Sequence, residues 1–301
     1  MSSIFFRNAI AYRLTQAVEI THDLLAKQAH RQPSARELST AGFVAPYGAE
    51  LCLPVACSTC HVTIIAMQTS ERVLPASVVR DELKTKIAKI EAEQMRKVYK
   101  KEREQLKDDI IQTLLPQAFI RHKVIRAAII GSLILVETTS SKQAEKLLTL
   151  LREALGSLPC RPVNVKQAPA ASFTEWLKAD SIGRDFNLLH DCELVGLDDG
   201  KVKINRLDLT SEEVQNHLAT GKLVTKLALS WSDKLSFVLD DKLTLRRIRF
   251  DDLLQEQAEQ DGGDDQAGQV IASYAIMAGT FAELFADLLD VLGGEDVPKE
   301  A

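Results

Sequence analysis

The residues best suited to chemistry are three cysteines and a histidine within a stretch of ten residues. Cys57, Cys60 and His61 have the spacing of a haem-attachment motif, and Cys52 adds the C-x4-C-x2-C spacing of plant-type iron–sulfur proteins. Thiolates and imidazole also bind zinc, although the second close pair of a zinc site is absent. Small apolar cysteines at the start of a strand give the same pattern, which is the simpler interpretation. A redox or metal-binding protein built on this cluster is the alternative interpretation.

No other group of residues forms a catalytic or metal-binding motif in the sequence. The six histidines are scattered, and none pairs with a serine or cysteine in a recognisable nucleophile motif. Gly131, Gly156 and Gly221 are isolated, so no phosphate-binding loop is predicted. The acidic stretch 261–265 lacks the spacing and the late glutamate of an EF-hand. We therefore expect no catalytic residue, no metal and no cofactor, and a function other than catalysis.

Three groups of basic residues are better candidates for a binding site. They are Arg96, Lys97, Lys100, Lys101 and Arg103; then Lys201, Lys203, Arg206, Lys222 and Lys226; and finally Arg246, Arg247 and Arg249. Lysine and arginine neutralise phosphates and release counterions, and this requires no reading of bases. A solvated surface explains each group taken alone. Whether the three groups converge depends on the tertiary structure.

The distribution of charge agrees with a surface that binds a polyanion. The net charge is −5, but residues 251–301 contain 13 acids and one base, so the rest of the chain carries +7. A solvated acidic C-terminal helix without a role is the alternative. With 46% hydrophobic and 26% charged residues, the composition is that of a soluble globular protein. No bilayer-spanning run and no signal peptide are expected, so we expect a cytoplasmic protein with reduced cysteines.

The elements that must position these residues mix strands and helices without a regular βαβ repeat. Strands are predicted over 4–14, 61–68, 118–130, 133–138, 192–197, 201–207, 222–231, 234–239 and 243–250. Gly131-Ser132 and Asp198-Asp199-Gly200 are the predicted turns of two hairpins within 118–138 and 192–207. Helices are predicted over 21–28, 77–107, 141–155, 172–177, 210–221 and 268–292. Thr21 is the expected N-cap of the first helix, and Thr210 with Glu213 forms an expected capping box. This order favours an α+β fold with mixed antiparallel sheets.

The helix predicted over 77–107 is long and highly charged. Its apolar stripe, which includes Ile87, is narrow, so we expect it to project from the body rather than lie in the core. Steps of three and four residues place Arg96, Lys100 and Arg103 on one of its faces. An apolar run to Phe119 follows, and Phe119 has two interpretations. Periodicity favours a core residue, whereas an exposed aromatic residue there would suit a contact between subunits.

Several blocks of sequence share a likeness with one known family. They are residues 86–94 followed by 114–119, residues 151–159, 174–176, 208–213 and 221–229, and the ending 292–295. Together they resemble the RdgC family of recombination-associated proteins in proteobacteria. The resemblance extends from Phe5 to Glu295.

The resemblance implies a DNA-binding protein rather than an enzyme. RdgC-like proteins are ring-shaped homodimers whose basic hole encircles duplex DNA with little sequence preference, and they restrain RecA-promoted strand exchange. The implied partners are thus double-stranded DNA, with single-stranded DNA as a further ligand, and a second copy of the chain. A nucleoid-associated protein of the cytoplasm is implied, with no membrane partner.

The resemblance also assigns residues and regions. Arg96, Arg206 and Lys222 match basic positions that face the hole, and Lys97, Lys100 and Lys101 are the expected neighbours of Arg96. Phe119 matches an aromatic residue at a dimer contact, with Leu115 beside it. Residues 1–75 are the expected first part of a central and base region, residues 76–120 a projecting helical tip, and residues 121–301 the rest of the central and base α+β region.

Overall fold

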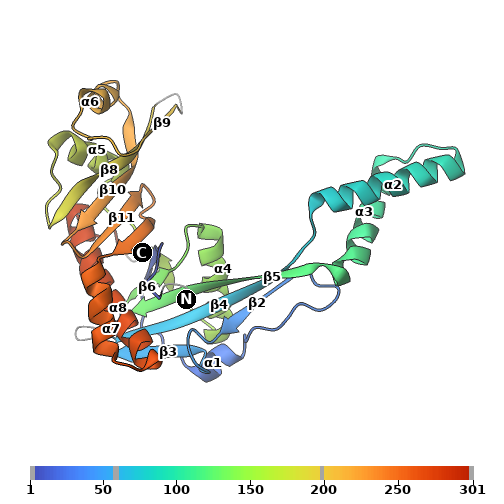
Figure 1. The fold of residues 1–301 in the computed structure, drawn as a ribbon, viewed down its shortest axis with the longest axis horizontal. Helices are drawn as coiled ribbons and strands as arrows, with labels where there is room; N and C mark the ends of the chain where they lie inside the picture. Colours follow the sequence, from blue (N-terminus) through green and yellow to red (C-terminus); the bar gives the residue numbers. More distant parts are fainter. Residues whose placement is uncertain (1–3, 57–60, 197–199, 298–301) are drawn as a thin grey trace.

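The computed structural model describes residues 4–56, 61–196 and 200–297. In these residues the chain forms two antiparallel sheets, joined by helices, and a helical arm (Figure 1). The α+β class predicted from the sequence is confirmed. The five-stranded sheet and the arm lie at opposite ends of the molecule, and the seven-stranded sheet lies between them (Figure 1).

The seven-stranded sheet has the order β2-β4-β5-β6-β1-β7. The seventh strand, β3, also pairs with β4, along residues 61–65, whereas β2 pairs with residues 66–71. The strands of this sheet are β1 Ile10–Leu14, β2 Ser39–Val44, β3 Cys52–Ala56, β4 His61–Val73, β5 Phe119–Ile130, β6 Leu133–Val136 and β7 Cys160–Pro162. The predicted hairpin between β5 and β6 is confirmed, and Gly131 takes the left-handed φ of +57° that its turn requires. The first strand begins only at Ile10, and β2, β3 and β7 were not predicted.

The five-stranded sheet has the order β12-β11-β10-β8-β9. Its strands are β8 Phe186–Val195, β9 Lys201–Ile204, β10 Leu223–Trp231, β11 Leu235–Asp240 and β12 Leu245–Phe250. The pairing of β8 with β9 is as predicted, but residues 198–199 of their predicted turn lie outside the described residues. Helices α5 Pro169–Ala179 and α6 Glu212–Ala219 accompany this sheet. The predicted cap of α6 is wrong: Ser211 is the N-cap, because Thr210 instead donates its hydroxyl to Asp208 at 2.7 Å.

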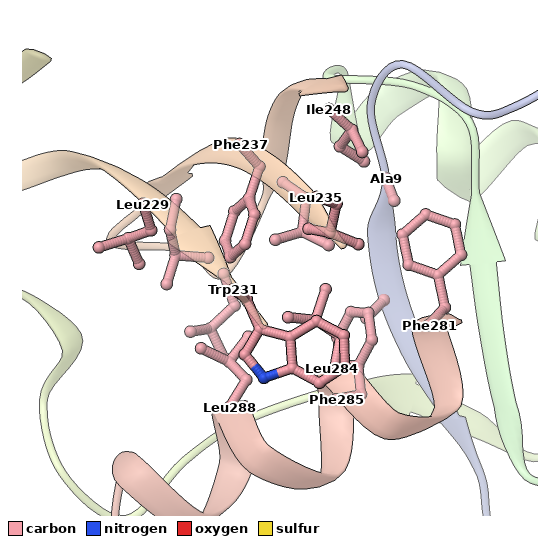
Figure 2. Close-up of a cluster of buried hydrophobic side chains, with 14 of the residues drawn as sticks. Ala9, Leu229, Trp231, Leu235, Phe237, Ile248, Phe281, Leu284, Phe285 and Leu288 are labelled. Carbon is pink, nitrogen blue, oxygen red and sulfur yellow. The ribbon is translucent and has the colours of Figure 1, made fainter. Parts of the chain in front are cut away.

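One hydrophobic core joins both sheets through helix α8, Gln266–Val291, which follows α7, Asp252–Gly262. Figure 2 shows Phe281, Leu284 and Leu288 of α8 packed against side chains of the five-stranded sheet, and Phe281 close to Ala9. The indole of Trp231 is buried there and donates a hydrogen bond to Asp287 at 3.0 Å. Each large apolar side chain buried in this way stabilises the fold by about 1.5–3 kcal/mol. The burial of α8 therefore fixes one sheet against the other.

By length and composition alone, helix α8 could cross a membrane. The expectation that no apolar run is long enough for a bilayer was therefore too strong. Half of the most apolar part of α8 is buried inside the chain, where it contacts both sheets. This is how the core helix of a folded domain packs.

A second core covers the opposite face of the seven-stranded sheet. Helices α1, His22–Ala26, and α4, Ser141–Leu155, bury Leu25, Leu147 and Leu151 against residues of the sheet. Thr21 caps α1 as predicted, by accepting a hydrogen bond from the backbone N–H of Leu24. The seven-stranded sheet thus lies between two cores.

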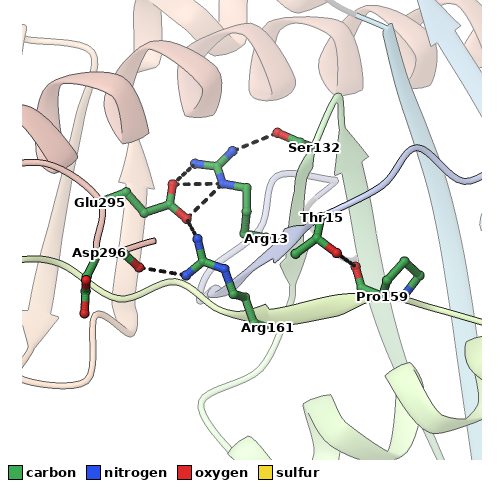
Figure 3. A network of polar contacts seen from close by, with 7 residues as sticks. All are labelled: Arg13, Thr15, Ser132, Pro159, Arg161, Glu295 and Asp296. Carbon is green, nitrogen blue, oxygen red and sulfur yellow. Dashed lines mark hydrogen bonds and ion pairs between the residues drawn. The ribbon is translucent and has the colours of Figure 1, made fainter. Parts of the chain in front are cut away.

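A polar network ties the segment after α8 to the seven-stranded sheet (Figure 3). The carboxylate of Glu295 accepts hydrogen bonds from Arg13 of β1 at 3.0 Å and from Arg161 of β7 at 2.8 Å. Arg13 also donates to Ser132, and Arg161 to the carbonyl of Asp296. Because the three charged side chains are largely shielded from water, their pairing is stronger than that of surface ion pairs.

The arm begins where β4 and β5 run beyond their neighbours, up to the pair Val73 and Phe119. It is a helical hairpin of α2, Ala76–Gln94, and α3, Lys100–Leu114, followed by the short 3-10 helix η1, Leu115–Gln117. The prediction of a single helix to residue 107 is wrong, because Met95 adopts a left-handed φ of 49° and the chain reverses there. The reversal lets the arm bury Ile87 and Ile110, which a single projecting helix would leave in water.

Arg72 clamps the base of the arm to the body. One nitrogen of its guanidinium donates to the carbonyl oxygens of Leu115, at 3.0 Å, and of Pro116 and Ala118, each at 3.3 Å. The other nitrogen donates to the carbonyl oxygens of residues 33 and 34, in the loop before β2. A planar group with five donors can bridge two backbone segments in this way, and lysine cannot.

We expect Arg72→Ala to loosen the arm without unfolding the sheets. Removing a charged donor from backbone carbonyls costs about 2 kcal/mol or more. Hydrogen–deuterium exchange of residues 100–118 should therefore accelerate, while that of α8 stays slow. The control is Arg121→Ala, since Arg121 is exposed on the same ribbon and forms a surface ion pair with Glu71. If residues 100–118 exchanged equally fast in the two variants, Arg72 would not be the residue that clamps the arm.

Candidate nucleic-acid interface

Arg96 lies in the turn at the tip of the arm and not on a helix, which corrects the predicted basic face. Its guanidinium binds both carboxylate oxygens of Glu102, at 2.7 and 2.6 Å, and donates to Gln94 at 2.7 Å. The hydrogen bonds from Arg96 hold the pKa of Glu102 below its usual value. The charge of Arg96 is thus largely balanced within the tip.

Lys97, Lys100 and Lys101 differ from Arg96. All three are exposed, and none has an ion-pair partner within the described part of the chain. Because the neighbouring Glu102 is occupied by Arg96, these lysines are free to bind an anion from outside. Their contact with DNA remains a prediction.

The five-stranded sheet carries a row of charges on the face away from α5 and α8. Glu193 lies between Lys203 and Lys226 on neighbouring strands and accepts from Lys226 at 2.9 Å. That hydrogen bond is the main reason why the pKa of Glu193 is lowered. Arg246 pairs with the buried Asp240 at 2.8 Å. Lys226 and Arg246 are therefore largely balanced within the sheet, whereas the exposed Lys203 lies 3.9 Å from the same carboxylate and is balanced only in part. Only part of the two late basic groups is thus available for a ligand.

Arg206 and Lys222, the predicted contacts on this sheet, lie in separate places. Arg206 follows β9 with a left-handed φ of 56°, and its backbone N–H donates to Asp191 at 3.0 Å. Its side chain lines a surface depression with Arg247 and Arg249. Lys222 precedes β10, is half-buried, and donates to the hydroxyl of Thr220 at 3.1 Å. The sequence did not single out Arg247 and Arg249 as partners of Arg206, because their proximity depends on the pairing of distant strands.

Phe119 is 87% exposed, so the interpretation as a core residue is wrong. It starts β5 opposite Val73, which is also exposed. Leu115 is only 4% exposed and lies within the chain. Phe119 thus offers an apolar contact surface at the base of the arm, whereas the buried Leu115 is not accessible to a second subunit.

Two histidines meet at a buried serine, an arrangement that no local motif indicated. The ring nitrogens of His30 and His122 lie 2.7 and 2.8 Å from the hydroxyl oxygen of Ser70. His30 reaches this place by crossing β2 at Gly42, where a Cβ atom would lie 2.3 Å from the Cα of His30. Ser70 is completely buried, so its hydroxyl is not open to a substrate. The cluster is a structural link between β4, β5 and the segment after α1.

The cysteine cluster gains no support. Cys57 and Cys60 lie outside the described residues, and His61 begins β4. Cys52 is buried at the start of β3, and burial raises the pKa of its thiol, which disfavours the thiolate that a metal needs. In the described ranges, no group of three or more potential ligands from histidine, cysteine, aspartate and glutamate is close enough to hold a metal ion.

The arrangement is that of an α+β protein with a clamped helical arm and unpaired basic residues at its two ends. A family model described as "Putative exonuclease, RdgC" matches residues 4–295. The chain is 53% identical to the recombination-associated protein RdgC of Pseudomonas paraeruginosa and 54% identical to that of Pseudomonas aeruginosa, over 98% of this chain and 99% of each relative. It is 51% identical to that of Pseudomonas entomophila over the same shares. The chain belongs to the RdgC family of recombination-associated proteins.

The histidine cluster predicts how stability depends on pH. Burial, and then the charge of His122, lower the pKa of His30 below its usual value of about 6.5. Below about pH 6.5 the unfolded chain therefore binds more protons than the folded chain, so the free energy of unfolding should fall as the pH falls to the pKa of folded His30. Urea denaturation at several pH values between about 7.5 and 5 measures this.

The matched variants are His30→Gln and His190→Gln. His190 is exposed and outside the cluster. The first substitution should flatten the pH dependence, whereas the second should leave it unchanged. If the free energy of unfolding of His30→Gln depended on pH as steeply as that of the parent, His30 would not be the group responsible.

Proposed function

We propose that this chain acts as a homodimer that encircles duplex DNA without sequence preference and so restrains RecA-promoted strand exchange. The observation that carries the proposal is the group of unpaired lysines at the tip of the projecting arm, Lys97, Lys100 and Lys101. Binding through phosphates needs such charges and no base-reading geometry. Arg206 and Lys222 contribute further positive charge from the other end of the molecule, and Arg96 acts mainly by shaping the tip.

The shape of the chain supports a ring. The arm and the five-stranded sheet lie at opposite ends with the seven-stranded sheet between them (Figure 1). Two such copies related by a two-fold axis can meet at both ends and enclose a hole. In this arrangement residues 76–120 form the tip region, and residues 1–75 and 121–301 form the central and base regions. Phe119 supplies the apolar anchor of one contact, next to the 3-10 turn in which Leu115 is buried.

We propose that the chain is not a nuclease, although the matching family model is described as a "Putative exonuclease". The names of the curated relatives state an association with recombination and no enzymatic activity. Metal-assisted cleavage of phosphodiesters uses clustered ligands, and the described residues offer no such cluster. A DNA-binding protein of this kind acts in the cytoplasm, on the nucleoid, by occupying DNA that RecA would use.

Binding to a random-sequence duplex should depend steeply on salt. A contact with about six phosphates gives a slope of about −5 in log affinity against log salt, hence roughly a thousandfold loss between 50 and 200 mM. Fluorescence anisotropy across a salt series measures the slope, and light scattering on the same samples gives the mass of the complex. An affinity that is nearly constant with salt, or binding by a monomer, would contradict the proposal.

Two further measurements separate encirclement from other modes. On a linear duplex, a closed ring slides off free ends but is retained when bulky groups block both ends. A protein that binds through a surface contact should be retained equally on both duplexes. With magnesium present, an end-labelled duplex should stay at full length. Progressive shortening would favour the exonuclease named by the family model.

Phe119→Ala should weaken the dimer without unfolding the chain, because the side chain is exposed in the single copy. Loss of an aromatic anchor at an interface costs about 2 kcal/mol or more, which raises the dissociation constant at least about thirtyfold. Sedimentation across a dilution series measures this. The control is Tyr99→Ala, which removes a similarly exposed aromatic side chain at the far end of the arm. A dimer that is equally stable in both variants would exclude Phe119 as the anchor.

A further inference from the structure

A depression of about 500 Å³ lies on the face of the five-stranded sheet that α5 and α8 leave uncovered. Its floor includes Ala228 and Val238, which are direct cross-strand partners on β10 and β11. Its walls carry three arginines, Arg206, Arg247 and Arg249. We call this site the arginine depression.

Irregular pairing on both sides shapes the arginine depression. On β8, the register with β10 shifts between the partners of Leu227 and Leu229, next to Ala228. On β12, the register with β11 shifts between the partners of Ser236 and Val238. Such bulges re-aim side chains at functional sites. Here they lie on both sides of the floor, and Asp191 and Arg247, which come from the shifted segments, both line the depression.

Asp191 organises the site and is the one acid among the described residues that line it. One carboxylate oxygen accepts the backbone N–H of Arg206 at 3.0 Å, and the other pairs with the guanidinium of Arg247 at 3.3 Å. Arg206 and Arg247 both have left-handed φ values, 56° and 51°, which are costly for residues other than glycine. Both arginines that Asp191 contacts therefore adopt a backbone conformation that is uncommon for residues other than glycine.

The charge of the arginine depression is not balanced. Three arginines against one aspartate leave a net charge of +2. The guanidinium of Arg249 has no hydrogen bond or ion pair within the described part of the chain. Elsewhere on the same face Lys226 and Arg246 do have carboxylate partners. A group of three arginines with a single carboxylate beside it is suited to phosphate oxygens, which arginine binds with two parallel hydrogen bonds.

We infer that the arginine depression binds phosphate groups of the DNA backbone, with Arg249 as a direct ligand and Asp191 as the residue that positions Arg206 and Arg247. This inference rests on the proposed function, since it names the part of the sheet that holds the DNA. Two adjacent phosphodiesters carry the charge that the depression lacks. The small side chain of Ala228 leaves the depth that a phosphate and its sugar require.

The test compares Arg249→Gln with Lys178→Gln. Lys178 lies on α5, which covers the opposite face of the same sheet. Both variants therefore remove one positive charge from the five-stranded sheet and its helices. Arg249→Gln should weaken binding to a random duplex at least about tenfold and lower the salt slope by about one. Lys178→Gln should change neither, and Arg249→Lys should restore the slope but only part of the affinity.

Pyrophosphate tests the site without DNA. At matched ionic strength, millimolar pyrophosphate should raise the thermal midpoint of the parent and of Lys178→Gln above that in sodium chloride, but not that of Arg249→Gln. If Arg249→Gln matches Lys178→Gln in both assays, the inference is overturned while the proposed function stands. If pyrophosphate acts through Arg249 but the parent binds no duplex, the phosphate site stands and the proposed function fails.

Discussion

Helix α8 buries Phe281, Leu284 and Leu288 in a core that reaches both sheets, and the rest of the architecture depends on this burial. A single apolar helix between two sheets fixes their relative orientation, because neither sheet can move without opening a close-packed core. The network of Arg13, Arg161 and Glu295 then holds the segment after α8 in place. The uncovered face of the five-stranded sheet is therefore a rigid platform, on which charged side chains keep fixed positions.

On that platform and on the arm, pairing divides the basic residues into two kinds. Arg96, Lys226 and Arg246 have carboxylate partners within the chain, so they stabilise local structure and add little attraction for an external anion. Lys97, Lys100, Lys101 and Arg249 have no such partner in the described ranges and retain their full charge for a ligand. This division explains how a chain with a net charge of −5 can present basic surfaces, since its acids are concentrated elsewhere.

The orientation of the arm depends on how its base is attached to the body. A helical hairpin with little apolar surface of its own is only marginally stable, so its direction depends on how its base is held. Arg72 holds that base by bridging the loop at residues 33–34 and the carbonyls around Leu115. The exposed Phe119 lies immediately beyond this clamp, so its position is set by the body of the protein rather than by the tip of the arm.

Local patterns of residues were enough to predict the α+β class, most strands, the turn at Gly131 and the long C-terminal helix, because periodicity and turn residues act over a few positions. Blocks spread over most of the chain also identified the family. The reversal at Met95, the exposure of Phe119, the meeting of His30 and His122 at Ser70, and the convergence of Arg206 with Arg249 became visible only in the folded chain. These features depend on which distant segments pack together, and the free energy of that packing is absent from any local pattern of residues.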